Sequence, residues 1–286
     1  MLLTPVNQFN WQANNFSNLF PGNAAATTLT ADGAAHTKGS NTAVLAGLAE
    51  DVYEMAITVS LGSTDTVIRR QMIDLLIDPA AGAGNAGSSW SVAINNLYCN
   101  SPTLNATMHG FRFNFPLYLR AGTAIGARVQ DVVGGATCRF SIQLLGKPTR
   151  PELLKVGTVV QTIGATTAST SGVTVVPGNS AWGSYSASIG ALTRPSWFWQ
   201  LGLGSADAGM TSASYWFDIA EDATAKYPCA RMITYNGTTS EQAAKGEFGQ
   251  TMPIHNAAAG QNVYVRGYCN GTSDTSMSAV VYAVGG

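Results

Sequence analysis

Charged residues are scarce in this chain of 286 residues: Asp, Glu, Lys and Arg make up 11% of it, whereas a soluble domain usually has about a quarter. The 15 basic and 16 acidic side chains nearly cancel, giving a formal net charge of -1. No basic surface is therefore expected for binding DNA or RNA phosphates. Low charge in a chain rich in Gly, Ala, Ser and Thr indicates a surface that other protein covers.

Long apolar runs are absent as well. None approaches the roughly 20 residues that cross a bilayer, and the N-terminus MLLTPVNQFNWQ lacks the basic and apolar regions of a signal peptide. We therefore expect neither a membrane-spanning segment nor secretion. The four cysteines show no C-x-x-C pair, which excludes the usual zinc and redox spacings, so we predict buried free thiols at Cys99, Cys138, Cys229 and Cys269.

Histidine is nearly missing too. His36, His109 and His255 lie far apart, and none has a second histidine or a carboxylate at ligand spacing. The chain contains neither a G-x-S-x-G elbow nor a recognisable cysteine and histidine pair. We predict no metal, no cofactor and no enzyme activity, and we expect His255 at the surface or at a subunit contact.

The stretch AGAGNAG fits the dinucleotide pattern G-x-G-x-x-G at Gly82, Gly84 and Gly87. A dinucleotide site needs a helix to begin there, so that its N-terminal amides face the pyrophosphate. The residues that follow, SSWSVAINNLYC, alternate like a strand, and Asp78-Pro79 ends the preceding strand. The sequence therefore predicts a hairpin loop here.

An internal repeat organises the chain. The segment that starts at Lys38 aligns with the one that starts at Trp182, which pairs Gly39 with Gly183 and Leu48 with Leu192. Later blocks follow in the same order. They pair Asp74 with Asp218, Asp78 with Asp222, Pro116 with Pro253, Gly122 with Gly260, and Arg128 with Arg266, and the closing blocks are CRFSIQLLG and SMSAVVYAVG. We predict a tandem duplication.

Each block alternates like a strand. Met55, Ile57 and Val59 share one face of the first, and CRFSIQL alternates in the same way. Six such strands in each copy, with Gly, Ser, Asn and Asp turns, predict an all-β chain of two tandem antiparallel β-sandwich domains of jelly-roll type, with a barrel as the alternative. The expected divisions are an N-terminal arm at 1–25, a domain at 26–148, a linker at 149–157 and a domain at 158–286.

The repeated aspartates and arginines have competing interpretations. The aspartates could bind calcium or act as an acid and base couple, but Asp at strand ends commonly makes turns by bonding backbone amides, which we favour. Arg128 and Arg266 are expected to pair with those aspartates or to line an interface.

Two aromatic groups are candidate contact sites. The arm holds Phe9, Trp11, Phe16 and Phe20, more apolar side chains than a free tail carries, so we expect it to dock on the body or on a neighbouring subunit. In RPSWFWQ, Trp197 and Trp199 could form a sugar-stacking platform, but packing between sheets or domains is favoured.

The segments at Gly39-Ser40, Leu61 to Asp65 and Pro116 to Val129, with a weaker second set around Gly183, Leu203 and Pro253, resemble structural β-sandwich proteins of tailed bacteriophages. The resemblance implies a virion component without catalysis, of the capsid cement or decoration type. It would assemble in the host bacterial cytoplasm as a homo-oligomer and bind the major capsid protein or other virion proteins. The alternatives are a tail, neck or fibre protein that binds a host glycan through Trp197 and Trp199, or a carbohydrate-binding module.

Overall fold

The computed structural model describes residues 11–13, 26–61, 69–101, 110–146, 155–164, 173–185, 188–206, 213–221, 228–236, 251–270 and 277–286. Throughout these ranges the regular elements are all β-strands, which confirms the all-β prediction. Within the same ranges, no helix is long and apolar enough to cross a membrane.

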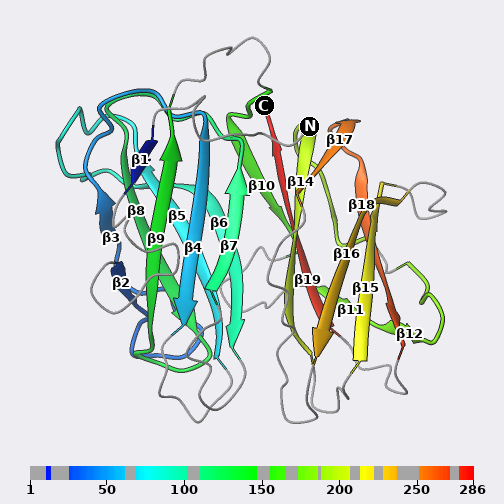
Figure 1. The fold of residues 1–286 in the computed structure, drawn as a ribbon. Coiled ribbons are helices and arrows are strands. Elements are labelled where there is room, and N and C mark those ends of the chain that lie inside the picture. Colours follow the sequence, from blue (N-terminus) through cyan, green and yellow to red (C-terminus); the bar gives the residue numbers. More distant parts are fainter. Residues whose placement is uncertain are drawn as a thin grey trace.

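The first half of the chain forms two antiparallel sheets that face each other (Figure 1). One has the order β1 (Trp11–Ala13), β9 (Thr137–Leu145), β4 (Glu54–Leu61), β7 (Gly110–Phe115), with β2 (Thr27–Thr30) also paired to β9. The other has the order β3 (Thr42–Leu45), β8 (Ala124–Asp131), β5 (Arg69–Asp78), β6 (Ser91–Ser101). This strand order is that of a jelly roll.

The second half repeats this order. In one sheet β10 (Val159–Ile163) and β11 (Val173–Val175) pair with β19 (Met277–Gly285), followed by β14 (Ser196–Ala206) and β17 (Thr251–Ala257). In the other, β12 (Pro177–Asn179) and β13 (Gly190–Ala191) pair with β18 (Asn262–Cys269), followed by β15 (Ala213–Ala220) and β16 (Pro228–Asn236). All pairings are antiparallel except that between β12 and β18.

The prediction of six strands in each half was too low. The strands it missed are short: β2 and β3 have four residues each, and β10 to β13 have between two and five. Such segments hold too few residues for an alternating pattern to show.

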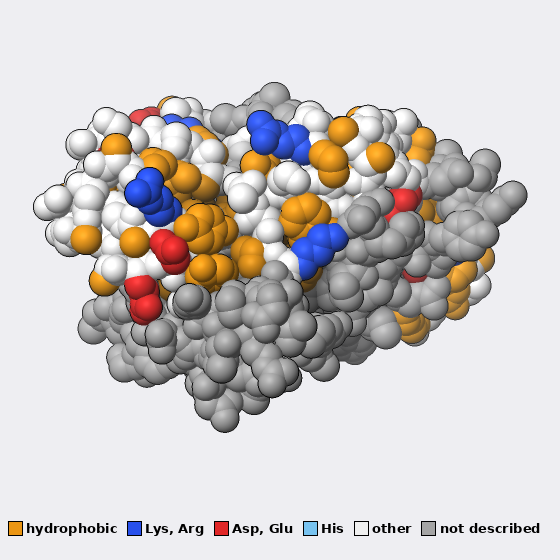
Figure 2. Space-filling view, turned by 90° about the horizontal axis from the view of Figure 1, so that it is seen from above, with side chains coloured by type: hydrophobic (Ala, Val, Ile, Leu, Met, Phe, Trp, Pro, Cys, Tyr) orange, Lys and Arg blue, Asp and Glu red, His pale blue; other side chains and the backbone are white. Residues whose placement is uncertain are grey.

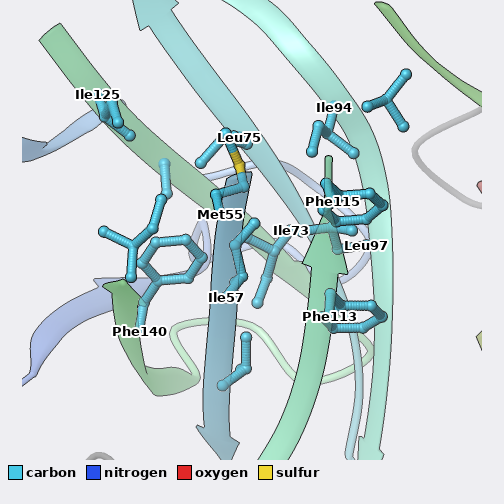
Figure 3. Close-up of a cluster of buried hydrophobic side chains, with 14 of the residues drawn as sticks. Met55, Ile57, Ile73, Leu75, Ile94, Leu97, Phe113, Phe115, Ile125 and Phe140 are labelled. Atoms are coloured by element: carbon cyan, nitrogen blue, oxygen red, sulfur yellow. The ribbon is translucent and has the colours of Figure 1, made fainter. Parts of the chain in front are cut away.

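The core of the first jelly roll contains the inward side chains that alternation predicted (Figure 3). Met55, Ile57 and Val59 of β4 are fully buried, as are the inward residues of β9. The opposite face departs from expectation, because Thr58 and Ser141, which point away from this core, are only 8% and 4% exposed. Alternation therefore located the core correctly but overestimated the exposure of the outer face.

The two jelly rolls share one apolar cluster. Strands β6 and β7 lie at matching edges of the first sandwich, and the sheet of β10, β19 and β14 lies against them (Figure 1). Val280, Tyr282 and Val284 of β19 belong to the core of the first jelly roll, while Val281 and Ala283 belong to that of the second. Strand β19 is thus buried on both faces, which explains its nearly continuous apolar sequence.

Tyr282 enters the open edge between β6 and β7. Its ring packs edge-on against Phe113 and Phe115, with centroids 5.8 and 6.0 Å away. Its hydroxyl accepts a hydrogen bond from the Tyr98 N–H at 2.6 Å and donates one to the Asn96 carbonyl at 3.0 Å. A buried phenol whose hydrogen bonds are made in this way fixes one jelly roll on the other.

A β-bulge in β6 supplies acceptors for this junction. Ile73 pairs with Leu97 and Leu75 with Ile94, so Asn95 and Asn96 together lie opposite a single residue of β5. Asn96 has a left-handed φ of 52°. The Asn95 carbonyl accepts a hydrogen bond from the Thr162 hydroxyl of β10, beside the bond from Tyr282 to Asn96.

Strand β14 completes the junction on the side of β7. The fully buried Gln200 accepts a hydrogen bond from the Asn114 N–H at 3.3 Å and donates one to the Arg112 carbonyl. Gly202 lies under the Tyr282 ring, and a Cβ there would come within 3.0 Å of it. The absence of a side chain at Gly202 thus makes room for Tyr282.

Candidate functional site

An aspartate and arginine ion pair occupies the same place in both jelly rolls. In the first, Asp74 of β5 lies directly across from Arg128 of β8, whose Nε donates to Asp74 Oδ2 at 2.8 Å. In the second, Asp218 of β15 lies across from Arg266 of β18, with Arg266 Nη2 2.9 Å from Asp218 Oδ2. The expected pairing of these arginines is confirmed. The turn interpretation of Asp74 and Asp218 was wrong, because both lie within strands.

Asp78 does make the turn that its position suggested. Its carboxylate accepts hydrogen bonds from the N–H groups of Ser89, Ser88 and Ala80, and these bonds lower its pKa. The stretch AGAGNAG forms the loop between β5 and β6, where Gly84 donates to the Gly47 carbonyl. A strand follows this loop, so the predicted hairpin loop is confirmed.

The aligned residues Lys38 and Trp182 both contact the ion pair of their own jelly roll. Lys38 Nζ lies 2.8 Å from Asp74 Oδ1 and also donates to the Met72 carbonyl. Burial lowers the pKa of Lys38 to about 8, with Asp74 opposing the shift. Trp182 instead stacks on Arg266, whose Cζ lies 4.6 Å from the ring centroid. The same position thus contributes a cation in one half and an aromatic ring in the other.

The main chain beside these residues also matches. Gly39 donates its N–H to the Val129 carbonyl and Gly183 donates to the Gly267 carbonyl, both at 2.8 Å. Each acceptor is the residue directly after the paired arginine. A Cβ at Gly39 would lie 2.0 Å from the Thr30 carbonyl oxygen, so this close approach requires glycine.

Further aromatic rings surround Arg266. Its Cζ also lies 4.6 Å from the Tyr185 ring centroid, so the guanidinium contacts two rings. Tyr268 lies 5.7 Å from Trp182 and 5.0 Å from Trp216, measured between centroids. We call Trp182, Tyr185, Trp216, Arg266 and Tyr268 the aromatic–arginine cluster.

Sequence reasoning missed this cluster, although its signal was present. The repeat aligns Trp182, Tyr185, Trp216 and Tyr268 with Lys38, Asn41, Met72 and Gln130. Aromatic residues thus replace non-aromatic ones at four positions around a shared ion pair. Comparison of the two copies position by position would have found this difference.

The stretch RPSWFWQ was interpreted correctly as packing. Trp199 is fully buried in the second core and donates from Nε1 to the Ser196 hydroxyl at 2.7 Å, while Phe198 packs against the shared cluster. A sugar-binding platform of Trp197 and Trp199 is therefore wrong, as is Trp199 as a partner contact. Trp197 is partly buried, and Lys155 Nζ lies 4.5 Å from its ring centroid.

The other predicted contact residues are placed only in part. Trp11 lies in β1, which pairs with β9 through Leu145, so this part of the arm adds a strand to the first jelly roll. Phe9, Phe16 and Phe20 lie outside the described residues. His255 belongs to β17, at the edge of its sheet.

The upper end of the molecule in Figure 1 is the face that Figure 2 shows from above, and its described surface carries few charged side chains. Figure 2 shows hydrophobic side chains gathered over the middle of its described surface, with isolated Lys or Arg and Asp or Glu among them. Glu54, where β4 begins, has a carboxyl group with a raised pKa. Burial raises its pKa to about 7, which Arg112 partly opposes, and its Oε2 is buried with no hydrogen-bond partner among the described residues.

The cysteines match the sequence analysis where they are described. Cys99, Cys138 and Cys269 are buried free thiols, and burial raises the pKa of Cys99 well above its ordinary value. Cys229 falls in β16, where side chains are outside the described set. No group of three His, Cys, Asp or Glu in the described part of the chain could hold a metal ion.

Comparisons with known proteins give remote structural likenesses only. No family model and no curated protein matches the chain. The structure of PNGF-II is 9% identical with a TM-score of 0.45, covering 98% of this chain and 66% of that one, so this chain spans about two thirds of its length. The Cowpea mosaic virus top component is 10% identical with a TM-score of 0.36, covering 91% of this chain and 88% of that one.

A tandem CBM22-1 and CBM22-2 domain of Paenibacillus barcinonensis Xyn10C is 9% identical with a TM-score of 0.26, covering 96% of this chain and 93% of that one. None of these likenesses assigns a function to this chain.

Proposed function

We propose that the chain is a non-enzymatic structural protein of a tailed bacteriophage virion, of the cement or decoration type, that binds and stabilises the capsid shell. The observation that carries this proposal is the junction between the jelly rolls, where Tyr282, Gln200 and Thr162 bind main-chain groups of the first sandwich. The junction makes one stiff block from two binding modules.

A stiff block suits a protein that stabilises a shell. A protein that binds only the assembled shell stabilises it by mass action, and a joint that does not bend transfers that stabilisation from one capsid subunit to the next. The sequence resemblance to phage β-sandwich proteins and the 11% charged residues support the same role.

The equivalent construction of the two halves fits such a bridge. We propose that they arose by duplication of one jelly roll. The matched ion pairs, Asp74 with Arg128 and Asp218 with Arg266, support this origin. Two related modules in one chain can occupy two related places on a symmetric shell. The expected partners are the major capsid protein, other virion proteins and further copies of this chain.

Localisation on purified particles tests this function. Antibody against the chain, imaged by electron microscopy on intact virions, is expected to decorate the whole shell. Particles that lack the protein are expected to lose their genomes at a lower temperature. Labelling that is confined to tails would contradict the cement role. So would wild-type virions that contain none of the protein.

A further inference from the structure

The outer face of the sheet that contains β18 and β15 points away from the first jelly roll (Figure 1). Burial alternates along β18, where Val263, Val265 and Cys269 are fully buried while Arg266 and Tyr268 are partly exposed. On β15, Trp216 is partly exposed and Phe217 is fully buried. The aromatic–arginine cluster therefore lies on the solvent side of this sheet.

Arg266 gives this aromatic face a polar centre. Its guanidinium contacts the rings of both Trp182 and Tyr185, and its side chain is 24% exposed. Two of its five N–H donors point to Asp218 Oδ2. The other donors have no acceptor among the described residues and can bind a ligand.

Arg266 is ion-paired with Asp218, the residue directly across from it on β15. Asp218, which is fully buried, accepts two hydrogen bonds from the guanidinium. A paired guanidinium still donates hydrogen bonds but attracts anions weakly. The cluster thus suits an uncharged ligand that offers hydroxyl groups.

The first jelly roll provides a built-in comparison. At the positions of Trp182, Trp216 and Tyr268 it has Lys38, Met72 and Gln130. Met72 and Gln130 are each only 3% exposed, and Lys38 closes over Asp74. The ion pair alone is therefore sufficient for the fold, and the rings of the second half need another explanation.

We propose that the aromatic–arginine cluster is a binding site for a neutral saccharide. One face of a pyranose ring carries C–H groups of slight positive charge, which suit the negative face of an aromatic ring. The hydroxyls at the edge of the sugar would accept hydrogen bonds from Arg266. A protein partner, whose contacts also favour Trp, Tyr and Arg, is the alternative occupant, and the experiment below separates the two.

Saccharide titrations test the site on the full chain. Neutral gluco-, manno- and galacto-oligosaccharides are added while the indole N–H signals of Trp182 and Trp216 are followed by NMR. At least one series is expected to shift both signals. Trp182→Ala is expected to weaken its binding at least tenfold, whereas Trp182→Phe, which keeps a ring, should retain most of it.

The matched control is Lys38→Ala, the same position in the first jelly roll, which should leave binding unchanged. The site is contradicted if no neutral saccharide shifts the two indole signals at millimolar concentration, or if an acidic saccharide binds more tightly than every neutral one. It is also contradicted if Trp182→Ala leaves saccharide binding intact and instead abolishes self-association in sedimentation. Saccharide binding is independent of the virion role, so either proposal can fail alone.

Discussion

Single residues carry connections that the sequence suggested only in outline. Asp74 binds Lys38 and Arg128 through its two carboxylate oxygens and also accepts a hydrogen bond from the Asn96 N–H. One buried carboxylate thus joins the strands β5 and β8 to the bulge of β6. Its alignment with Asp218 showed that the position mattered, but the partner Lys38, 36 residues away, became evident only from the fold.

Replacement of Asp74 is the first prediction at this scale. Asp74→Ala leaves Lys38 and Arg128 without their shared anion, so we expect the free energy of unfolding to fall by about 3–5 kcal/mol. Urea denaturation measures this change. Asp32→Ala, which removes an exposed carboxylate that accepts from the Ala34 N–H, should cost less than about 1 kcal/mol. Equal losses in the two variants would contradict the role of Asp74.

Glu54 predicts a pH dependence. Its folded pKa of about 7 exceeds the ordinary value of 4.5 because burial disfavours the charged form. The folded state therefore binds the proton of Glu54 more tightly than the unfolded state does. The contribution of this proton to the free energy of unfolding is fully present below pH 4.5 and is lost as the pH rises through 7.

Glu54→Gln removes the titration while keeping the shape of the side chain. The variant should match the wild type near pH 4.5 and exceed its free energy of unfolding by about 1–3 kcal/mol at pH 8. Chemical denaturation at both pH values provides the measurement. A difference of the same size at pH 4.5 and pH 8 would show that the carboxyl does not titrate in this way.

At the level of elements, the long strands were predictable and the short ones were not. Period-2 alternation identified the core faces of β4 and β9, where each strand has one apolar side. It did not distinguish Trp197 from Trp199, because the register of β14 shifts between Ser196 and Phe198 and the two indoles lie in different surroundings. No local pattern marks such a shift.

The turns that precede β8 and β18 were predictable because glycine was repeated there. Gly122 and Gly260 have φ values of 86° and 84°. The first donates its N–H to the Leu48 carbonyl and the second to that of Leu192, which the repeat had already aligned. A glycine at this position of a tight turn provides the positive φ that the turn needs.

Substitution of Gly260 tests the turn. A Cβ at Gly260 would meet no atom within 4 Å, so the cost of Gly260→Ala comes from the backbone alone and should be about 1–2 kcal/mol. Gly260→Asn should cost less, because Asn adopts this conformation more readily. Thermal unfolding of both variants checks the order. Asn as costly as Ala would argue against backbone strain as the cause.

At the level of the whole molecule, the arrangement of the two jelly rolls could not be predicted from the sequence. The run AVVYAV in β19 indicates a strand buried on both faces, but it does not say what covers the second face. The first jelly roll covers that face, and the junction depends on Gly202, Gln200 and the bulge at Asn95 and Asn96. These residues come from distant segments, and no sequence pattern links them.

Tyr282→Phe tests the junction between the two jelly rolls. The ring still fills its site, but the two buried hydrogen bonds of the hydroxyl, from the Tyr98 N–H and to the Asn96 carbonyl, are lost, so we expect the free energy of unfolding to fall by about 1–3 kcal/mol. Calorimetry should show one cooperative transition in the wild type and a lower melting temperature in the variant. Two separate transitions in the wild type would mean that the jelly rolls unfold independently.

The central claim is that this block is a component of a capsid shell, and its copy number in purified virions tests that claim most directly. Quantitative mass spectrometry against the major capsid protein gives the number of chains in each particle. The cement role predicts hundreds of copies, in a fixed ratio to the capsid protein. A few copies in each particle, the number expected for a tail, neck or fibre, would contradict it.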